Sequence, residues 1–178
     1  MDIECVAYEP TDPADAEEEA DAAVPFDDLD VRHAANAQVN VLVTGEMTAA
    51  QALARRIHEL SDRCQARLLA VDCRAPAAAV ESVLGDALGV QTRAEREAEP
   101  WFRRAGTIVL RDVGRLDPAL QRRLADMLAA TSRDRRHARV IATSPEPLEE
   151  RVYEGTFDDT LYYRLNAIHL VVGRPLEG

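Results

Sequence analysis

The stretch that decides the fold is TIVLRDVGRL, residues Thr107–Leu116. An apolar run directly after Gly106 breaks into the charged pair Arg111-Asp112, and an amphipathic segment follows. A strand buried on both faces of a parallel sheet has such an apolar run, and its polar residues come at its C-terminal end. The stretch therefore predicts a central strand that carries Arg111 and Asp112 to the sheet edge where α/β proteins bind ligands.

Four more apolar runs alternate with segments of helical periodicity. Ala50, Leu53 and Ile57 recur at helical spacing, and Thr48 is the residue that we expect to cap their helix. Alternating strands and helices predict a parallel sheet that is covered on both faces. We therefore expect an α/β protein, a three-layer α/β/α sandwich with a five-stranded parallel sheet. The expected strands are 39–44, 67–73, the one starting at 107, 138–143 and 167–172, and the expected helices are 31–37, 48–62, 76–88, one starting at 118, 147–154 and 159–164.

The negative charge of the chain is concentrated at its N-terminus. Residues 1–30 hold 12 Asp or Glu and no basic residue, whereas residues 31–178 hold 20 Asp or Glu against 21 Arg, and the formal net charge is -11. Acidic segments with few apolar residues bury too little surface to fold. We expect residues 1–30 to be a flexible acidic arm and residues 31–178 to be one domain. The arm is either a solvated tail or a docking element for an arginine-rich partner surface.

The cysteines and histidines give no sign of a metal site. Cys5, Cys64 and Cys73 lack metal-ligand spacing, and so do the four histidines. We expect Cys64 and Cys73 to be small core residues, the alternative being a redox or metal role. The sequence shows no signal peptide and no apolar run of about 18 or more residues, so we expect a cytoplasmic location without membrane contact.

Five segments, in the same order and at nearly the same spacing, resemble the ATPase domain of the sigma-54-dependent transcriptional activators, the bacterial enhancer-binding branch of the AAA+ family. The resemblance covers roughly residues 31–175. It implies a P-loop nucleoside triphosphatase fold of the AAA+ type without the helical lid subdomain, because the sequence stops where the family enters that lid. The matching segments are VNVLVTGE with LARRIHELSDR, AVESVLG, AGTIVLRDVGRLDPALQRRLADML, ARVIATS and LEERVYEGTFDDTLYYRLNAIHLVV.

The phosphate loop, or Walker A motif, departs from the family's pattern. In the family it reads roughly GESGTGK, where glycines let main-chain NH groups approach the phosphates and lysine reaches the outer two. Here it reads GEMTAAQ, apparently one residue shorter, and the chain contains no lysine. Ala50 or Gln51 falls where lysine should be. The resemblance thus places a degenerate nucleotide site at Gly45, Glu46, Thr48, Ala50 and Gln51, and we expect no bound ATP or Mg²⁺.

The acidic Walker B motif is altered as well. Family members carry Asp-Glu there, because one carboxylate holds Mg²⁺ and the other polarises the attacking water. This chain has Arg111 and Asp112 instead. Asp112 is either a surviving catalytic carboxylate or the partner of Arg111 in a local ion pair, and we expect the ion pair. We also expect the Arg111 guanidinium to occupy the space that the metal would use.

Three residues are possible interface residues: Arg164, Asp158 and Trp101. In the family an arginine after the Phe of a GxF segment is thought to reach the neighbouring subunit's ATP site, but here Asp158 follows Phe157. Arg164 is kept and serves either a subunit contact or a local ion pair. Trp101 is expected to anchor the polar segment 90–103, which lacks the family's GAFTGA-type loop that grips the sigma factor.

These losses fall on four parts of one mechanism: the phosphate lysine, the Mg²⁺ carboxylate, the trans-acting arginine and the lid. The sequence therefore predicts a catalytically inactive pseudo-ATPase, a regulatory or scaffolding protein-interaction module in bacterial signalling or transcription control. Its partner would be an active AAA+ protein, another signalling protein or a second copy. Two alternatives stay open: a divergent ATP-binding transcriptional regulator of the sigma-54 activator family, and a self-assembling structural protein. The basic turn RDRRHAR, residues 133–139, is expected to be solvated rather than to bind nucleic acid.

Overall fold

The computed structural model describes residues 28–88, 105–131 and 137–173. The predictions made for the arm up to residue 27, for the segment around Trp101 and for most of the basic turn lie outside these residues. Within them, helices and strands alternate along most of the chain.

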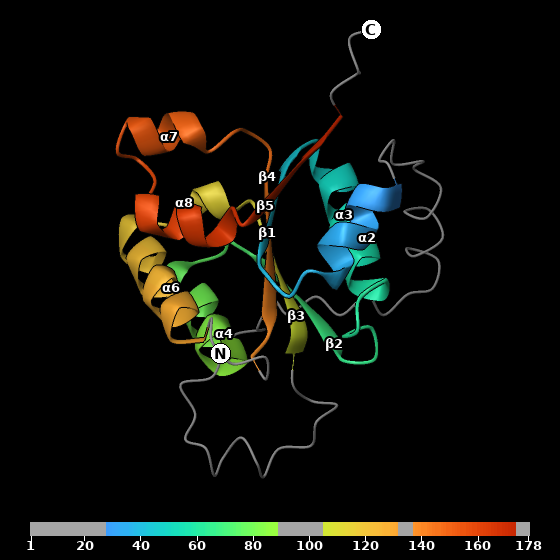
Figure 1. The fold of residues 1–178 in the computed structure, drawn as a ribbon. Helices are drawn as coiled ribbons and strands as arrows, with labels where there is room; N and C mark the ends of the chain where they lie inside the picture. Colours follow the sequence, from blue (N-terminus) through green and yellow to red (C-terminus); the bar gives the residue numbers. More distant parts are fainter. Residues whose placement is uncertain (1–27, 89–104, 132–136, 174–178) are drawn as a thin grey trace, which may run out of the picture.

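A five-stranded sheet forms the middle of the molecule (Figure 1). Its strand order is β2-β3-β4-β1-β5, and every pairing is parallel. The predicted five-stranded parallel sheet is therefore confirmed. Its strands are β1 (Val41–Gly45), β2 (Arg67–Asp72), β3 (Ala105–Arg111), β4 (Arg139–Ser144) and β5 (Ile168–Val172).

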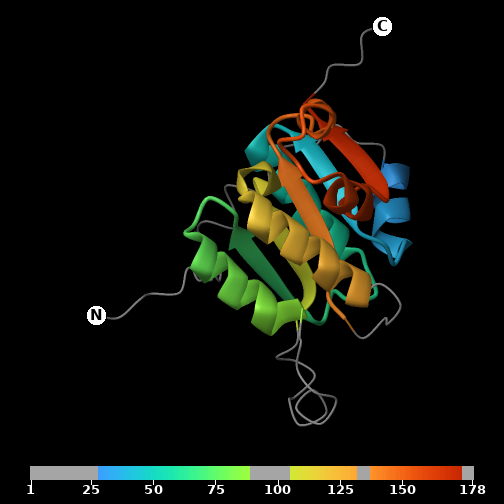
Figure 2. The ribbon, with the colours of Figure 1, turned by 90° about the vertical axis from the view of Figure 1, so that its left-hand side faces the viewer.

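Helices cover both faces of this sheet, as the sequence predicts. Two helices lie on one face, α2 (Asp28–Asn36) and α3 (Met47–Glu59). The other face carries α4, α6, α7 and α8, and Figure 2 shows α4 and α6 lying across it. The three-layer sandwich is therefore confirmed. The bounds on this second face are α4 (Ala77–Leu88), the 3-10 helix η2 (Val113–Arg115), α6 (Pro118–Thr131), α7 (Glu149–Tyr153) and α8 (Asp159–Leu165).

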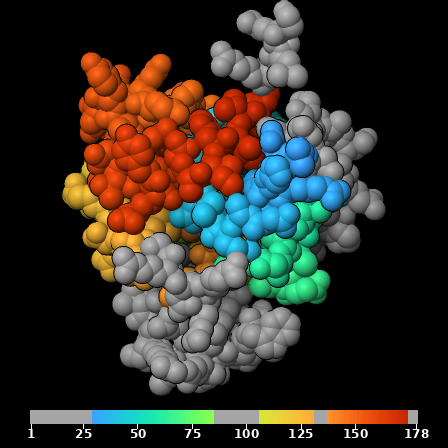
Figure 3. All heavy atoms as spheres, in the orientation of Figure 1, coloured from blue at the N-terminus to red at the C-terminus, as the bar shows by residue number. Residues whose placement is uncertain are grey.

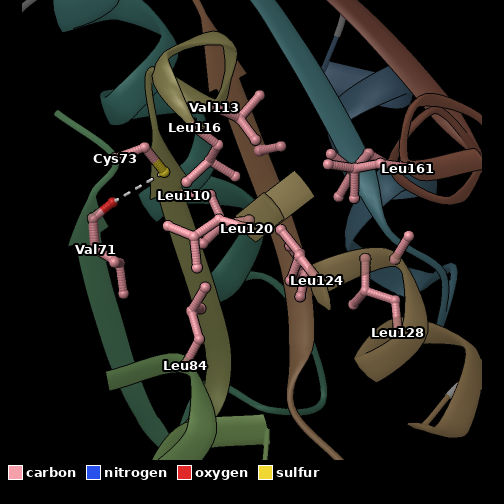
Figure 4. Close-up of a cluster of buried hydrophobic side chains, with 14 of the residues drawn as sticks. Val71, Cys73, Leu84, Leu110, Val113, Leu116, Leu120, Leu124, Leu128 and Leu161 are labelled. Atoms are coloured by element: carbon pink, nitrogen blue, oxygen red, sulfur yellow. Dashed lines mark hydrogen bonds between the residues drawn. The ribbon is translucent and has the colours of Figure 1, made fainter. Parts of the chain in front are cut away.

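Two hydrophobic cores form because side chains of a strand point alternately to the two faces of the sheet. In β1, Leu42 belongs to the core under α4, α6 and α8, whereas Val41 belongs to the core under α2 and α3. Figure 4 shows the first core, where Leu84 of α4, Leu110 of β3 and Leu124 of α6 meet. The apolar runs of the sequence are explained by this double burial.

The prediction for the two cysteines is half right. Cys73 is buried in the first core, and burial raises the pKa of its thiol to about 12. Cys64 is exposed, because it lies in the turn between α3 and β2 rather than in an element that packs on the sheet. Cys73 is thus a structural core residue whose thiol stays protonated and unreactive.

Two helix boundaries differ from the prediction by three residues. The first helix begins at Asp28 instead of Val31, so its start falls in the segment predicted as arm. Acidic residues such as Asp30 stabilise a first helical turn through the helix dipole. The helix expected to reach Asp62 ends at Glu59, since the chain turns there and the Ser61 hydroxyl donates to the His58 carbonyl at 2.7 Å.

In the part of the chain that the structure describes, no helix is long and apolar enough to cross a membrane. The same residues contain no group of three or more His, Cys, Asp or Glu placed to hold a metal ion.

Candidate functional site

Gly45, the first residue of the predicted phosphate loop, ends β1 in a conformation that only glycine adopts readily. Its φ is +127°, and a Cβ added there would lie 2.1 Å from the carbonyl oxygen of Val172 in the neighbouring strand β5. The close approach of β1 and β5 therefore requires glycine at this position. The sheet alone explains why Gly45 is present.

Glu46 caps the helix that follows. Its carboxylate oxygens accept hydrogen bonds from the main-chain NH groups of Thr48 at 2.9 Å and Ala49 at 2.7 Å. The bond from the Ala49 NH, followed by that from Thr48, lowers the pKa of the Glu46 carboxyl. The prediction that Thr48 caps this helix is wrong, because α3 begins at Met47 and Glu46 supplies the capping oxygens.

The next two positions of the loop lie inside α3. Ala50 is fully buried in the core with α2 and β1, and Gln51 is partly buried one residue further along the helix. Neither side chain carries a positive charge. The position that the resemblance assigns to lysine is thus either a core position or a neutral amide.

Arg111 lies at the C-terminal end of β3 beside β2, where its Cα partner is Asp72. Arg74 grips the Asp72 carboxylate with two side-chain hydrogen bonds, of 3.0 and 2.7 Å. Hydrogen bonding from Arg74 lowers the pKa of Asp72, and the charge of Arg111 contributes in the same direction. The Nε atom of Arg111 is buried and has no hydrogen-bond partner among the described residues. A positive charge thus stands at the strand end where a metal ligand would be negative.

The predicted ion pair between Arg111 and Asp112 is wrong. The chain leaves β3 at Asp112 in the left-handed conformation, with φ of 55°, and turns into η2. The Asp112 carboxylate lies 3.4 Å from the guanidinium of Arg115, three residues further on. The main-chain NH of Asp112 donates to Thr143 Oγ1 at 3.3 Å. Asp112 is therefore committed to its own turn and to β4.

A cleft of about 480 Å³ opens beside this turn, at the C-terminal ends of β3 and β4. Asp112 and Glu146 line it together with Arg115 and Arg151, so its charged groups are balanced. None of residues 45–51 lines this cleft. The loop after β1 and the carboxylate of Asp112 thus do not face each other across it.

The two predicted interface residues that the structure describes lie in and beside α8. Asp158 caps this helix, since its Oδ1 accepts from the Leu161 NH at 2.8 Å. Arg164 is partly buried, and its carbonyl accepts from Asn40 Nδ2 at 3.0 Å. The alternative of a local Arg164 ion pair has no support among residues 28–88, 105–131 and 137–173. The subunit contact stays a prediction.

A polar network that the sequence does not predict joins the end of β1 to α7 and α8. Thr44 Oγ1 lies 2.8 Å from His169 Nε2 of β5, and His169 Nδ1 lies 3.7 Å from a Glu149 carboxylate oxygen. The Tyr162 hydroxyl donates to the same oxygen at 3.0 Å and accepts from Asn166 Nδ2 at 2.6 Å. Burial, with a smaller contribution from Glu149, raises the pKa of Tyr162 to about 12. The residues of this polar network are up to 125 positions apart in the sequence, so no local sequence pattern could reveal the network.

The all-parallel sheet with strand order β2-β3-β4-β1-β5 and helices on both faces defines the class: a P-loop nucleoside triphosphatase fold of the AAA+ type. A crystal structure of NtrX from Brucella abortus in complex with ATP is similar with a TM-score of 0.62 and 21% identity, over 82% of this chain and 34% of that chain. The P-loop NTPase domain of the sigma-54 transport activator from E. coli is similar with a TM-score of 0.56 and 18% identity, over 81% of this chain and 91% of that chain.

Sequence similarity identifies the family. The sequence model of the family described as the sigma-54 interaction domain matches residues 27–171, and the chain belongs to this family. Regulatory protein AtoC of Escherichia coli (strain K12) is 35% identical over 156 residues, and the match covers 80% of this chain and 34% of AtoC. Phenol regulator MopR of Acinetobacter guillouiae is 36% identical over 155 residues, 80% of this chain and 28% of MopR. The chain thus spans about a third of the length of these relatives.

Proposed function

We propose that this chain is a divergent transcription-regulatory domain of the sigma-54 activator family that acts without hydrolysing ATP. The relatives named above are regulators, which favours a role in transcription control over that of a structural scaffold. The observation that carries the loss of ATP chemistry is the start of α3, where Ala50 is buried, Gln51 is neutral and neither position has the family's lysine. The main-chain NH groups of Thr48 and Ala49, which a bound phosphate would need, are already bonded to the Glu46 carboxylate.

Electrostatics at the loop oppose a triphosphate. An ATP phosphate would have to displace the Glu46 carboxylate and would then be repelled by it. Phosphate loops offset such repulsion with a lysine, and this chain has none to offer.

The metal position is unfavourable for a separate reason. Mg²⁺ is held through oxygen ligands, usually carboxylates and the substrate phosphates. Arg111 brings a guanidinium to the end of β3, and the Asp112 carboxylate is paired with Arg115. A divalent cation would meet a positive charge where it needs a ligand.

Without ATP turnover the domain regulates by binding other proteins. A partner of the same family, another signalling protein and a second copy of this chain are each compatible with the AAA+ fold. The family's description names an interaction with the sigma factor, but segment 90–103 lacks the loop with which the family grips it, so we do not propose the sigma factor as the partner.

Titration calorimetry with MgATP and a phosphate-release assay on the full chain test the proposal. NtrX from Brucella abortus, whose crystal structure contains ATP, is the positive control for binding. We expect no saturable heat and no phosphate release above the buffer rate. Micromolar binding or measurable turnover would refute the proposal and support an ATP-binding regulator instead.

A matched pair of variants separates the role of the Glu46 charge from that of the missing lysine. Glu46→Gln removes the charge and keeps one oxygen acceptor, enough for one of the two NH groups that the carboxylate binds, whereas Glu59→Gln removes an exposed charge at the other end of α3. If the Glu46 carboxylate excludes anions, inorganic phosphate should bind more tightly to Glu46→Gln than to Glu59→Gln. Equal weak binding would leave the missing lysine as the main cause.

A further inference from the structure

Residues 147–167, which contain α7 and α8, present a surface of unusual composition, here called the α7–α8 face. Every exposed charged side chain in this range is acidic. Two tyrosines are exposed with them, Tyr153 at 94% and Tyr163 at 72%. The acidic side chains are those of Glu149, Glu150, Glu154 and Asp159.

The two helices form one continuous surface. Figure 3 shows the atoms of α7 and α8, in orange and red, as a single projecting corner of the molecule. The connection between the helices is held down, because the Arg151 carbonyl accepts from the main-chain NH groups of Thr156 and Phe157 at 2.8 and 3.0 Å. Acidic and aromatic groups of both helices are therefore presented together.

This corner is also fixed to the body of the protein. The Tyr162 hydroxyl and the Glu149 carboxylate join α8 to α7, and His169 and Thr44 continue the contacts to β5 and β1. On the side of α6, the buried Gln121 accepts from the Asp158 NH at 2.7 Å. A surface that is already ordered loses little conformational entropy when a partner binds.

We infer that the α7–α8 face is a docking surface for an arginine- or lysine-rich segment of a partner protein. The inference deepens the proposed function, because it gives the chemistry of the partner on which a domain without ATP turnover would act. Acidic side chains attract a basic segment and steer its approach. Exposed tyrosine rings add cation–π contacts with arginine and apolar area, and tyrosine is a frequent anchor in protein interfaces.

The charge of the face argues against other occupants. Phosphates of a nucleotide or of nucleic acid would be repelled by the four exposed carboxylates. A second copy presenting the same face would meet like charge with like charge. A basic protein segment is the occupant whose charge is complementary.

The test uses the full chain and a peptide of alternating arginine and alanine, with a peptide of alternating glutamine and alanine as the neutral control. Affinity is measured by fluorescence anisotropy at several salt concentrations, and the bound surface is mapped by amide chemical shifts. We expect binding of the arginine peptide only, weakening as salt rises. Shift changes should concentrate in residues 147–167.

Two triple variants with the same change in net charge distinguish this face from the acidic N-terminal segment. Glu150→Gln, Glu154→Gln and Asp159→Asn together remove three of the four exposed negative charges of the face, while Glu17→Gln, Glu18→Gln and Glu19→Gln neutralise the segment EEE near the N-terminus. Loss of three exposed ion pairs should weaken peptide binding about tenfold in the face variant. The N-terminal variant should bind as the unmodified chain does. The reverse pattern would overturn the inference.

The tyrosines are tested separately. The double variant Tyr153→Ala, Tyr163→Ala should bind the arginine peptide more weakly than the unmodified chain does. The double variant Tyr153→Phe, Tyr163→Phe should bind the peptide nearly as tightly as the unmodified chain, because phenylalanine keeps the ring. Equal binding by the alanine and phenylalanine pairs would show that the rings take no part. The remaining alternative is self-association through the α7–α8 face, which sedimentation of the chain alone tests. A dimer that the face variant abolishes would assign the face to self-association and overturn the inference. The calorimetry with MgATP is independent of all these outcomes.

Discussion

Substituting Gly45 with alanine should destabilise the fold strongly although no ligand is involved. The new Cβ would lie 2.1 Å from the Val172 carbonyl oxygen and 2.8 Å from the Val172 Cγ2 atom. Main chain cannot yield as a flexible side chain does, so β1 and β5 would have to separate locally. Overpacking of this kind costs about 1–3 kcal/mol. A φ of +127° in a residue with a Cβ adds about 1–3 kcal/mol of backbone strain.

The sum, about 2–6 kcal/mol, is a large fraction of the stability of a small domain. Urea unfolding followed by circular dichroism measures it on the full chain. Gly155→Ala is the matched control, because Gly155 also has a positive φ, +71°, but an added Cβ there meets nothing within 4 Å. We expect that control to cost about 1–2 kcal/mol. If the two variants unfold at the same urea concentration, the close approach of β1 to β5 is not what requires glycine.

Three further substitutions probe the buried polar groups. Burial lowers the pKa of the His58 imidazole, so as pH falls the unfolded chain takes up a proton at this side chain before the folded chain does. The free energy of unfolding should therefore fall as pH drops below about 6.5, by at most about 1.4 kcal/mol per pH unit. His58→Gln should flatten that slope in unfolding curves taken between pH 5 and 8. Gln121→Leu should cost about 2–4 kcal/mol in urea unfolding, because the Leu116 carbonyl and the Asp158 NH both lose their partner; an unchanged midpoint would mean that water replaces the amide. Arg139→Met should lower the free energy of unfolding by about 3–5 kcal/mol, because three main-chain carbonyls at and after the end of α2 lose a buried donor. A loss below about 1 kcal/mol in thermal unfolding would contradict this reasoning.

The fold can be predicted from the sequence because the patterns that indicate strands and helices recur along the chain. Apolar runs of strand length alternate with helical periodicity along most of the chain, and a parallel sheet covered on both faces is the arrangement that buries all of them. Strand bounds are nearly correct for the same reason, since a run ends where burial ends.

The candidate site is less predictable because it depends on single side chains. Thr48 is a good capping residue by type, yet α3 begins one residue before it at Met47, and the Glu46 carboxylate accepts from the NH groups of Thr48 and Ala49. Asp112 follows Arg111 directly, yet a left-handed turn brings its carboxylate to Arg115. Such choices are decided by local backbone geometry that residue type alone does not specify.

The contacts between α7, α8, β5 and β1 illustrate a second limit. His169 lies in β5 and is partly buried. Its partners Thr44 and Glu149 come from β1 and α7, and only the folded topology brings them within reach.

The Glu46 cap has a consequence for competition with dissolved ligands. Because its carboxylate is tethered two and three residues from the amides that it binds, its effective concentration is set by the chain and does not change with dilution. A free phosphate would have to compete at its cellular concentration against this tethered carboxylate. If the Glu46 carboxylate excludes phosphate as proposed, raising the concentration of nucleotide in the cell would change the occupancy of this anion position little.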